Sequence, residues 1–246
     1  MRALLAVSIA CATIARAEPV PETIVLPAGE VALRLVMEGS LDRQTPLRPL
    51  SFAPDAWFGA TDRLTVGIIH SSQSVDRIAA GATFCVRELA GTCDAPYRGS
   101  GLDARYAVAS GVAPRARFLL RDVDPGKPAL TLGALMRWSH RRFEVVADPY
   151  LRIGLGNRDL GNRDALVVPV WLGARVAGGR IAIRTGIDGD LAVWRDGWHV
   201  PVGVLFEGHP TPSLTVGVEL GYASLLGPQN TIRRSAMMLY AEWRIR

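Results

Sequence analysis

Apolar and polar residues alternate one by one along much of the chain. In the clearest segment, 180–188, one face would carry Ile181, Ile183 and Ile187, and the opposite face would carry Arg184. A period of two is typical of β-strands, because successive side chains point to opposite faces of a strand. Glycine and β-branched residues recur inside these runs, which favours strand over helix.

About twelve such segments can be counted, and their lengths suit the roughly nine to eleven residues with which a tilted strand crosses a bilayer. The sequence therefore predicts an all-β protein, a closed antiparallel transmembrane β-barrel of about 12 strands, within a range of roughly 10–14. The predicted strands lie near residues 30–38, 48–60, 62–71, 100–110, 113–121, 128–138, 142–153, 164–176, 180–188, 198–207, 211–221 and 232–246.

The connections between these segments alternate between long and tight. Outer-membrane barrels have short periplasmic turns and long extracellular loops, so this alternation favours a membrane barrel. A soluble all-β sandwich or lipocalin-like barrel is the alternative, but it has no reason to alternate its loop lengths so regularly. The long connections are 39–47, 72–99, 122–127, 154–163, 189–198 and 223–231, and the tight ones 59–62, 111–112, 139–141, 177–179 and 208–210.

The N-terminal segment has the three-part pattern of a secretory signal peptide. A positive charge at Arg2 precedes a short apolar run, and small residues at Ala15 and Ala17 favour cleavage before Glu18. The predicted organisation is a signal peptide at 1–17, an N-terminal periplasmic segment at 18–29 and the barrel domain at 30–246. Lipidation at Cys11 is a minor alternative, because the motif before it is incomplete.

The chain is basic, with a formal net charge of +5 and a pI of about 9.5. Its arginines are scattered singly among acids rather than clustered, so no nucleic-acid partner is expected. After removal of the signal peptide two cysteines remain, Cys85 and Cys93, and in an oxidising compartment they are predicted to form a disulfide. No cluster of soft ligands accompanies them, so we expect no metal and no cofactor.

If the apolar faces meet lipid, the opposite faces fill the lumen. The predicted pore-lining residues are Arg34, Arg105, Arg117, Arg137, Glu144, Arg152, Arg175, Arg184, Glu207, Glu219, Glu242 and Arg244. The same parity also places Arg115, Arg121, Glu38, Asp55, Asp103 and Asp148 inside. A network that leaves space would form a narrow passive channel for small solutes with an Arg-rich lumen, and the slight excess of Arg would favour anionic solutes. A network that extends across the lumen and fills it would form a non-conducting structural or surface-interaction barrel. The number of strands does not distinguish these two alternatives.

Aromatic residues near the predicted strand ends, among them Trp57, Tyr150 and Tyr240, are candidates for the aromatic girdles found at membrane interfaces. Among the histidines, His140 and His199 are expected to be solvated at turns or loop ends, and His209 to be a turn residue.

A weak enzymatic signal is the pair His70 and Ser72. A spacing of two places both side chains on one strand face, which would be the lipid face close to an external loop. A serine next to a histidine is a workable nucleophile for lipid-ester hydrolysis if a third group orients the histidine. No such group can be named, so we expect no enzyme activity and interpret the pair as a polar strand end.

Two segments carry a resemblance to a family. Residues 57–67, Trp-Phe-Gly-Ala-Thr-Asp-Arg-Leu-Thr-Val-Gly, look like a hairpin common in outer-membrane barrels. The last strand, 237–245, has one apolar face up to the chain end, as in the assembly signal of such proteins, although it finishes on Arg246 rather than on an aromatic residue. The chain thus resembles the uncharacterised, porin-like outer-membrane β-barrel proteins of Gram-negative bacteria. That resemblance implies an outer-membrane location after signal-peptide cleavage, with outer-membrane lipid, small solutes and, through the C-terminal strand, the barrel assembly machinery as partners.

Overall fold

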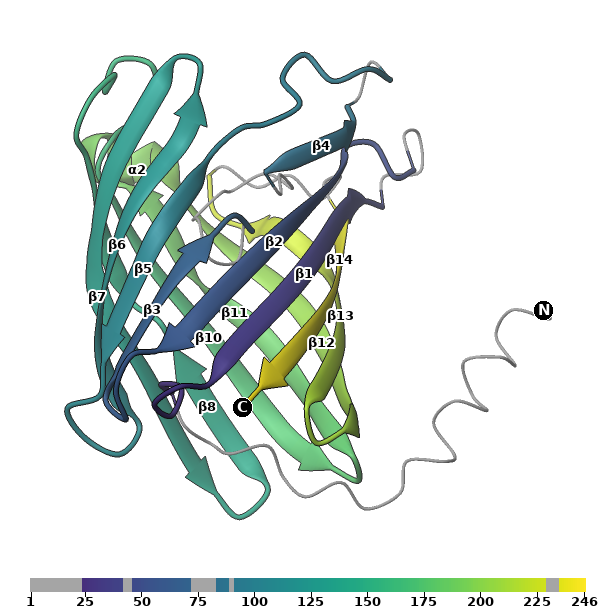
Figure 1. Cartoon of the computed structure of the whole chain (residues 1–246). Helices are drawn as coiled ribbons and strands as arrows, with labels where there is room; N and C mark the ends of the chain where they lie inside the picture. Colours follow the sequence, from purple (N-terminus) through teal and green to yellow (C-terminus); the bar gives the residue numbers. More distant parts are fainter. Residues whose placement is uncertain (1–23, 42–45, 72–82, 89–90, 229–234) are drawn as a thin grey trace, which may run out of the picture.

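The computed structural model describes residues 24–41, 46–71, 83–88, 91–228 and 235–246. Within them the chain forms a closed antiparallel β-barrel (Figure 1). The predicted signal peptide and Ser72 lie outside the described residues. No helix of the described part is long and apolar enough to cross a membrane.

The wall consists of long strands that follow the chain in order around the barrel. They are β1 (Val31–Ser40), β2 (Leu50–Gly59), β3 (Leu64–Ile69), β5 (Ser100–Tyr106), β6 (Val112–Val123), β7 (Gly126–His140), β8 (Phe143–Ala147), β9 (Tyr150–Gly154), β10 (Ala165–Val176), β11 (Gly179–Asp190), β12 (Trp198–Thr211), β13 (Leu214–Leu226) and β14 (Ser235–Ile245). The loop between β11 and β12 contains two short helical turns, Leu191–Val193 and α2 (Trp194–Gly197).

The barrel closes because β1 pairs with β2 on one side and with β14 on the other. β8 and β9 are successive parts of a single wall strand, since each pairs with both β7 and β10. The additional strand β4 (Phe84–Arg87) pairs with one end of β2, and its Phe84 also forms an isolated bridge with Tyr97. The wall therefore has twelve strands, and the predicted fold class is confirmed.

Two details of the predicted strands are wrong. The segment 142–153 is not one continuous strand, because the ladder breaks at Asp148 and Pro149. Proline has no N–H for the ladder, and the wall is continued there by bonds from Asp148 N to Pro169 O and from Ala134 N to Pro149 O, both 3.1 Å. The segment 122–127 is not a long loop, because β6 and β7 run on as a hairpin to Asp124 and Pro125.

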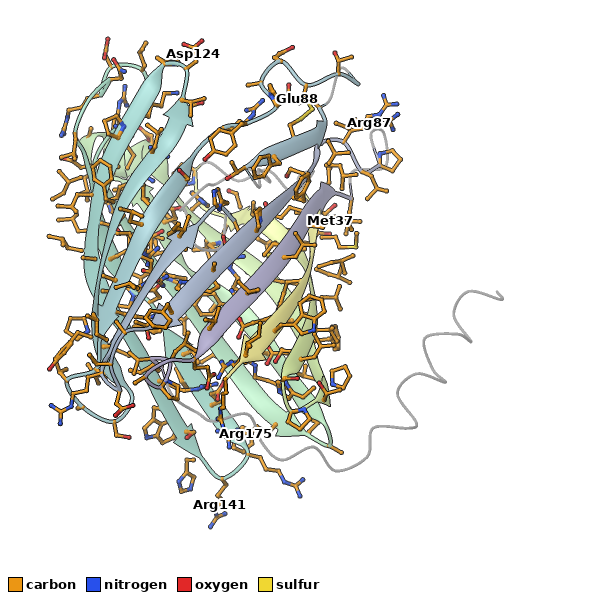
Figure 2. The ribbon with its side chains drawn as sticks, in the orientation of Figure 1. Met37, Arg87, Glu88, Asp124, Arg141 and Arg175 are labelled. Atoms are coloured by element: carbon orange, nitrogen blue, oxygen red, sulfur yellow. A yellow bond between two sulfur atoms is a disulfide. The ribbon has the colours of Figure 1, made fainter. Side chains whose placement is uncertain are left out.

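The two ends of the barrel differ. We call the end that carries the tight connections, such as those at Arg141 and after Val176, the turn end, and the opposite end, with the hairpin tip at Asp124 and the segment around β4, the loop end. Figure 2 labels Arg141 and Arg175 at the turn end and Asp124 and Glu88 at the loop end. β1 starts and β14 finishes at the turn end (Figure 1).

The outer surface of the wall is apolar. Large apolar side chains that alternate with buried ones are exposed by 37–60 %, as with Leu102 at 59 % and Ile183 at 51 %. Such a wide exposed apolar surface is far larger than the patches on soluble monomers and fits a lipid environment. Others on this face are Leu33, Leu35, Met37, Phe58, Val66, Ile68, Phe118, Leu132, Trp138, Leu172, Ile181, Val204, Phe206, Val216, Leu220 and Trp243.

The chain before β1 folds against the inner side of the wall at the turn end. Ile24 and Val25 are buried in one cluster with Ala113 of β6. Leu26 packs in the cluster of Trp57, and its backbone N–H donates to Thr65 Oγ1 at 2.7 Å. Residues 24–26 therefore narrow this end of the lumen. The predicted boundary between the N-terminal periplasmic segment and the barrel domain, at residues 29/30, stays a prediction.

Candidate functional site

The candidate site is the lumen, and the buried face of the strands supplies its side chains. All twelve residues predicted to line a pore lie on this face, where they alternate with the exposed apolar residues and take part in polar contacts with one another or with neighbouring polar groups. They are buried or partly exposed, from 1 % for the side chain of Arg117 to 34 % for that of Arg175. Whether they line a conducting pore stays a prediction.

One group of charges lies on β5, β6 and the break between β8 and β9. Arg115 donates from Nε to Asp103 Oδ1 at 2.6 Å and from Nη1 to Asp148 Oδ2 at 2.6 Å. Arg117 Nη2 donates to the same Asp148 oxygen at 2.7 Å. Two guanidinium groups and two carboxylates thus balance one another, and the break in the wall at Asp148 is where the second carboxylate enters the group.

A second group lies nearer the turn end. Glu144 of β8 accepts from Arg137 at 2.9 Å and lies 3.6 Å from Arg175. Arg180 of β11 bridges Glu144 to Glu207, with Nη2 2.9 Å from Glu207 Oε2. Arg180 is not among the residues predicted to line a pore, although it lies on the same strand face as Arg184, which is four residues further along.

Three inward aromatic residues each lie over a glycine of the neighbouring strand. The register pairs are Trp57 with Gly67, Tyr150 with Gly133, and Tyr240 with Gly217. A Cβ atom added to any of these glycines would overlap its aromatic partner. Glycine is therefore needed at Gly67 and Gly217 for close approach of a ring, and at Gly133 for close approach of Pro149 O and of the Cβ atom of Tyr150, rather than for a special backbone angle.

Arginines cover these rings on the lumen side. The Cζ atom of Arg34 lies 5.0 Å from the centre of the Trp57 ring and 5.4 Å from that of Tyr240, and the Cζ of Arg117 lies 4.5 Å from that of Tyr150. Trp57 Nε1 also donates to Asp103 Oδ2 at 2.9 Å, and the Tyr240 hydroxyl donates to Glu207. The rings therefore order the charged groups as well as filling space.

The lumen contains a cavity of about 130 Å³. Its lining comes from β1, β9 to β14 and the break before β9, and includes Glu38, Asp148, Arg184, Asp188 and Glu219. Side chains of the wall therefore do not fill the whole interior.

No protein-family model and no curated protein matches the chain. Similar solved structures include an outer membrane channel from Pseudomonas putida F1, with 13 % identity and a TM-score of 0.49 over 94 % of this chain and 100 % of that chain. A bacterial polysaccharide outer membrane secretin has 10 % identity and a TM-score of 0.44 over 88 % of this chain and 98 % of that chain. The outer membrane channel DcaP of Acinetobacter baumannii has 9 % identity and a TM-score of 0.38 over 91 % of this chain and 100 % of that chain. Similarity at this level does not indicate a function, which has to be inferred from the side chains of this protein.

The histidine of the enzymatic signal is held by backbone contacts. His70 Nδ1 lies 2.5 Å from Pro54 O, and the ring packs near those of Phe84 and Tyr97. The adjacent Ser71 is fully buried and donates from Oγ to Asp55 Oδ2 at 2.6 Å. The contacts described for His70 thus fix the end of β3, and Asp55 orients Ser71 rather than the His70 ring.

Three other sequence-based expectations are corrected. Trp57, Tyr150 and Tyr240 are not girdle residues but are buried in the lumen, because they share the strand face of the inward charges. His199 is not solvated: it is 4 % exposed, and its Nε2 lies 3.9 Å from Asp188 Oδ2. His209 is part of β12, with Nδ1 3.1 Å from Thr215 Oγ1.

The predicted disulfide between Cys85 and Cys93 is present. It ties β4 to the chain that follows, and the rings of Phe52, Phe84 and Tyr97 pack beside it with centroids 5.1 Å apart in each contact. Among the described residues, no group of three or more His, Cys, Asp or Glu side chains could hold a metal ion.

Proposed function

We propose that the chain is a narrow passive channel for small solutes in the outer membrane of a Gram-negative bacterium. The observation that carries this proposal is the cavity, lined in part by charged side chains, inside a barrel whose outer surface is apolar. Solute would enter at the loop end, which would face the cell exterior, and leave at the turn end toward the periplasm. Surrounding lipid would cover the outer face, and β14 would be the strand that engages the barrel assembly machinery.

The arrangement of the ion pairs favours passage. The pairs Arg115–Asp148, Arg180–Glu144 and Arg184–Glu219 each join strands that are next but one in the wall. They therefore run around the wall rather than straight across the lumen. The predicted preference for anions depends on guanidinium groups that have no carboxylate partner. Because these ion pairs neutralise much of the guanidinium charge, we expect the channel to prefer anions only weakly.

The test is single-channel recording of the refolded chain from Glu18 onward in a planar bilayer with a salt gradient. We expect discrete conductance steps and a reversal potential close to zero. A strongly anion-selective reversal potential would instead support the Arg-rich lumen as the selectivity element. A folded, inserted barrel that gives no steps would contradict the channel.

A second candidate is a non-conducting barrel, and it is favoured by the packing near the turn end. Ile24 and Val25 are buried inside the wall, and the side chains of Arg117 and Asp103 are only 1 % and 0 % exposed. Under this alternative the charged network stabilises the barrel, and the loop end provides a surface for interaction. Single-channel recording of the chain with and without residues 24–28 distinguishes the two. Conductance that appears only after the deletion would indicate a channel closed by this segment, and no conductance in either form would indicate a permanent scaffold.

A further inference from the structure

Arg105 of β5 differs from the other arginines of the inner face. In the described part of the chain it donates no hydrogen bond, and the carboxylate oxygen paired with it, Asp103 Oδ2, lies 3.9 Å from its Nε, beyond hydrogen-bond distance. The inward arginines that do donate a hydrogen bond to a carboxylate are Arg34, Arg115, Arg117, Arg137, Arg180, Arg184 and Arg244.

Asp103 is already bonded to other donors. Its Oδ1 accepts from Arg115 Nε at 2.6 Å, and its Oδ2 accepts from Arg115 Nη2 at 3.1 Å and from Trp57 Nε1 at 2.9 Å. Arg105 therefore has only the weaker attraction of an ion pair across 3.9 Å.

The charges that act most strongly on Arg105 balance one another in number. The negative ones are Asp103 and Glu242, and the positive ones are Arg115 and Arg34. Arg115 is bonded to Asp103, and Arg34 is bonded to Glu242 at 3.0 Å. The positive charge of Arg105 itself is what remains, and such a charge on the wall of a lumen attracts anions.

The terminal nitrogens of Arg105 are accessible from the lumen. The side chain is 16 % exposed, and its Nε is enclosed without an acceptor. Among the described residues Nη1 and Nη2 have no acceptor either, but unlike Nε they are not enclosed. A largely buried guanidinium is costly without acceptors, so these two nitrogens call for an acceptor that comes from the lumen.

The geometry of the guanidinium selects the kind of anion. Nη1 and Nη2 lie side by side in one plane, and two such N–H donors match the two oxygens of a carboxylate. The Cζ atom of Arg105 lies 5.5 Å from the centre of the Trp57 ring, and this contact restricts the movement of the guanidinium.

We infer that Arg105 is the binding site for a small carboxylate anion in the lumen. Nη1 and Nη2 would each donate to one oxygen of the carboxylate. The inference rests on the proposed function, because it names a class of solute for the channel, and it agrees with a weak preference for anions. Binding can nevertheless be measured without conduction.

The experiment follows the indole N–H resonance of Trp57 by NMR in the refolded chain from Glu18 onward, in detergent. Trp57→Phe identifies this resonance. The protein is titrated at constant ionic strength with propionate and with propylammonium, which has a similar body and the opposite charge. We expect a saturable shift with propionate and none with propylammonium. No saturable shift with propionate, or equal affinity for both, would overturn the inference.

Arg105→Gln removes the charge, and we expect propionate to bind at least roughly tenfold more weakly. Arg105→Lys keeps the charge but loses the two coplanar donors, so its affinity should lie between those of the other two proteins. The matched control is Arg142→Gln, which removes an exposed guanidinium from the tight turn between β7 and β8 and should leave affinity unchanged. Equal weakening in Arg142→Gln and Arg105→Gln would mean that the whole charge of the protein attracts propionate, and would contradict the site.

Stability tests the premise that Arg105 has no protein acceptor. We expect the urea midpoint of unfolding to be unchanged or higher in Arg105→Gln, because no hydrogen bond is lost. Arg115→Gln should lower the midpoint, because it removes the bonds to Asp103 and Asp148. An equally low midpoint in both variants would contradict the inference.

The two proposals fail separately. Propionate binding that is lost in Arg105→Gln, in a barrel that never conducts, would keep the anion site and contradict the channel. Conductance without saturable propionate binding would keep the channel and contradict the anion site.

Discussion

Arg34 Nε lies 3.0 Å from Glu242 Oε2, and the two residues are register partners on the first and last strands. This ion pair therefore spans the junction at which the barrel closes. Arg244 Nε lies 3.2 Å from the other oxygen of Glu242, so the same carboxylate also holds the end of β14. Closure of the barrel thus combines a complete backbone ladder between β1 and β14 with a buried charge pair.

Removal of one partner of this pair should destabilise the barrel. We expect Arg34→Gln and Glu242→Gln each to lower the free energy of unfolding by about 1–3 kcal/mol, because the remaining charge stays partly buried and loses one of its charge-assisted hydrogen bonds. The double variant should cost less than the sum of the two single variants. Urea unfolding of the refolded barrel in detergent measures all four proteins, and strictly additive effects would contradict a direct interaction.

The glycine beneath Tyr240 should tolerate no side chain. Gly217→Ala places a methyl group where the Tyr240 ring lies, so we expect the free energy of unfolding to fall by about 1–3 kcal/mol. Gly156→Ala is the control, because a Cβ there would be 3.6 Å from Pro128, an ordinary contact. If both substitutions change stability equally, the ring–glycine contact does not determine the effect.

Deletion of residues 24–28 should raise conductance. Ile24 and Val25 occupy space inside the wall at the turn end, and no backbone ladder with the barrel strands depends on them. We expect larger single-channel steps from the shortened chain, with circular dichroism that still shows a folded barrel. Unchanged steps would mean that the constriction lies elsewhere in the lumen.

Asp164 and Arg158 should make one connection at the loop end, between β9 and β10, sensitive to acid. Arg158 Nη2 donates to Asp164 Oδ2 at 2.7 Å, and this hydrogen bond lowers the pKa of Asp164, while Asp164 Oδ1 accepts from the Gly154 amide at 3.0 Å. Because the pKa is lowered in the folded chain, the contribution is present above the usual value near 4 and is lost as pH falls through the lowered pKa. The protection of the Gly154 amide against exchange, taken relative to the intrinsic rate at each pH, should therefore fall at low pH, and Arg158→Gln should move that onset to higher pH.

Loss of the disulfide should affect the loop end and leave the wall intact. The bond closes a segment of only eight residues in sequence separation, so the expected loss is roughly 2–3 kcal/mol and local to that segment. In the Cys85→Ser/Cys93→Ser variant we expect faster tryptic cleavage after Arg87 and Arg98. Barrel content by circular dichroism should be unchanged, and a collapse of the whole barrel would show that the segment is needed for folding.

The number of strands and the inward or outward orientation of their side chains could be predicted, because both depend on the sequence pattern within each segment. Side-chain parity is fixed within a strand, so Arg34, Glu242 and the other charges could be assigned to one face without knowing their partners. The same parity would have placed Trp57 inside with Asp55, and the error came from giving weight to its position near a strand end. The burial of His199 was not predicted, because a register irregularity in β12 separates this residue from the regular alternation that follows.

The sequence by itself determined that this chain alternates, that its apolar face can meet lipid, and that its charges must then gather inside, because a strand has only two faces. Only the tertiary structure decided which charges meet, where the wall breaks at Asp148, and that a cavity remains inside the barrel. Contacts such as Arg180 with Glu144 or Arg34 with Glu242 join residues 36 and 208 positions apart. They depend on the register of every strand between them and on the closure of the barrel, and no local pattern in the chain contains that information.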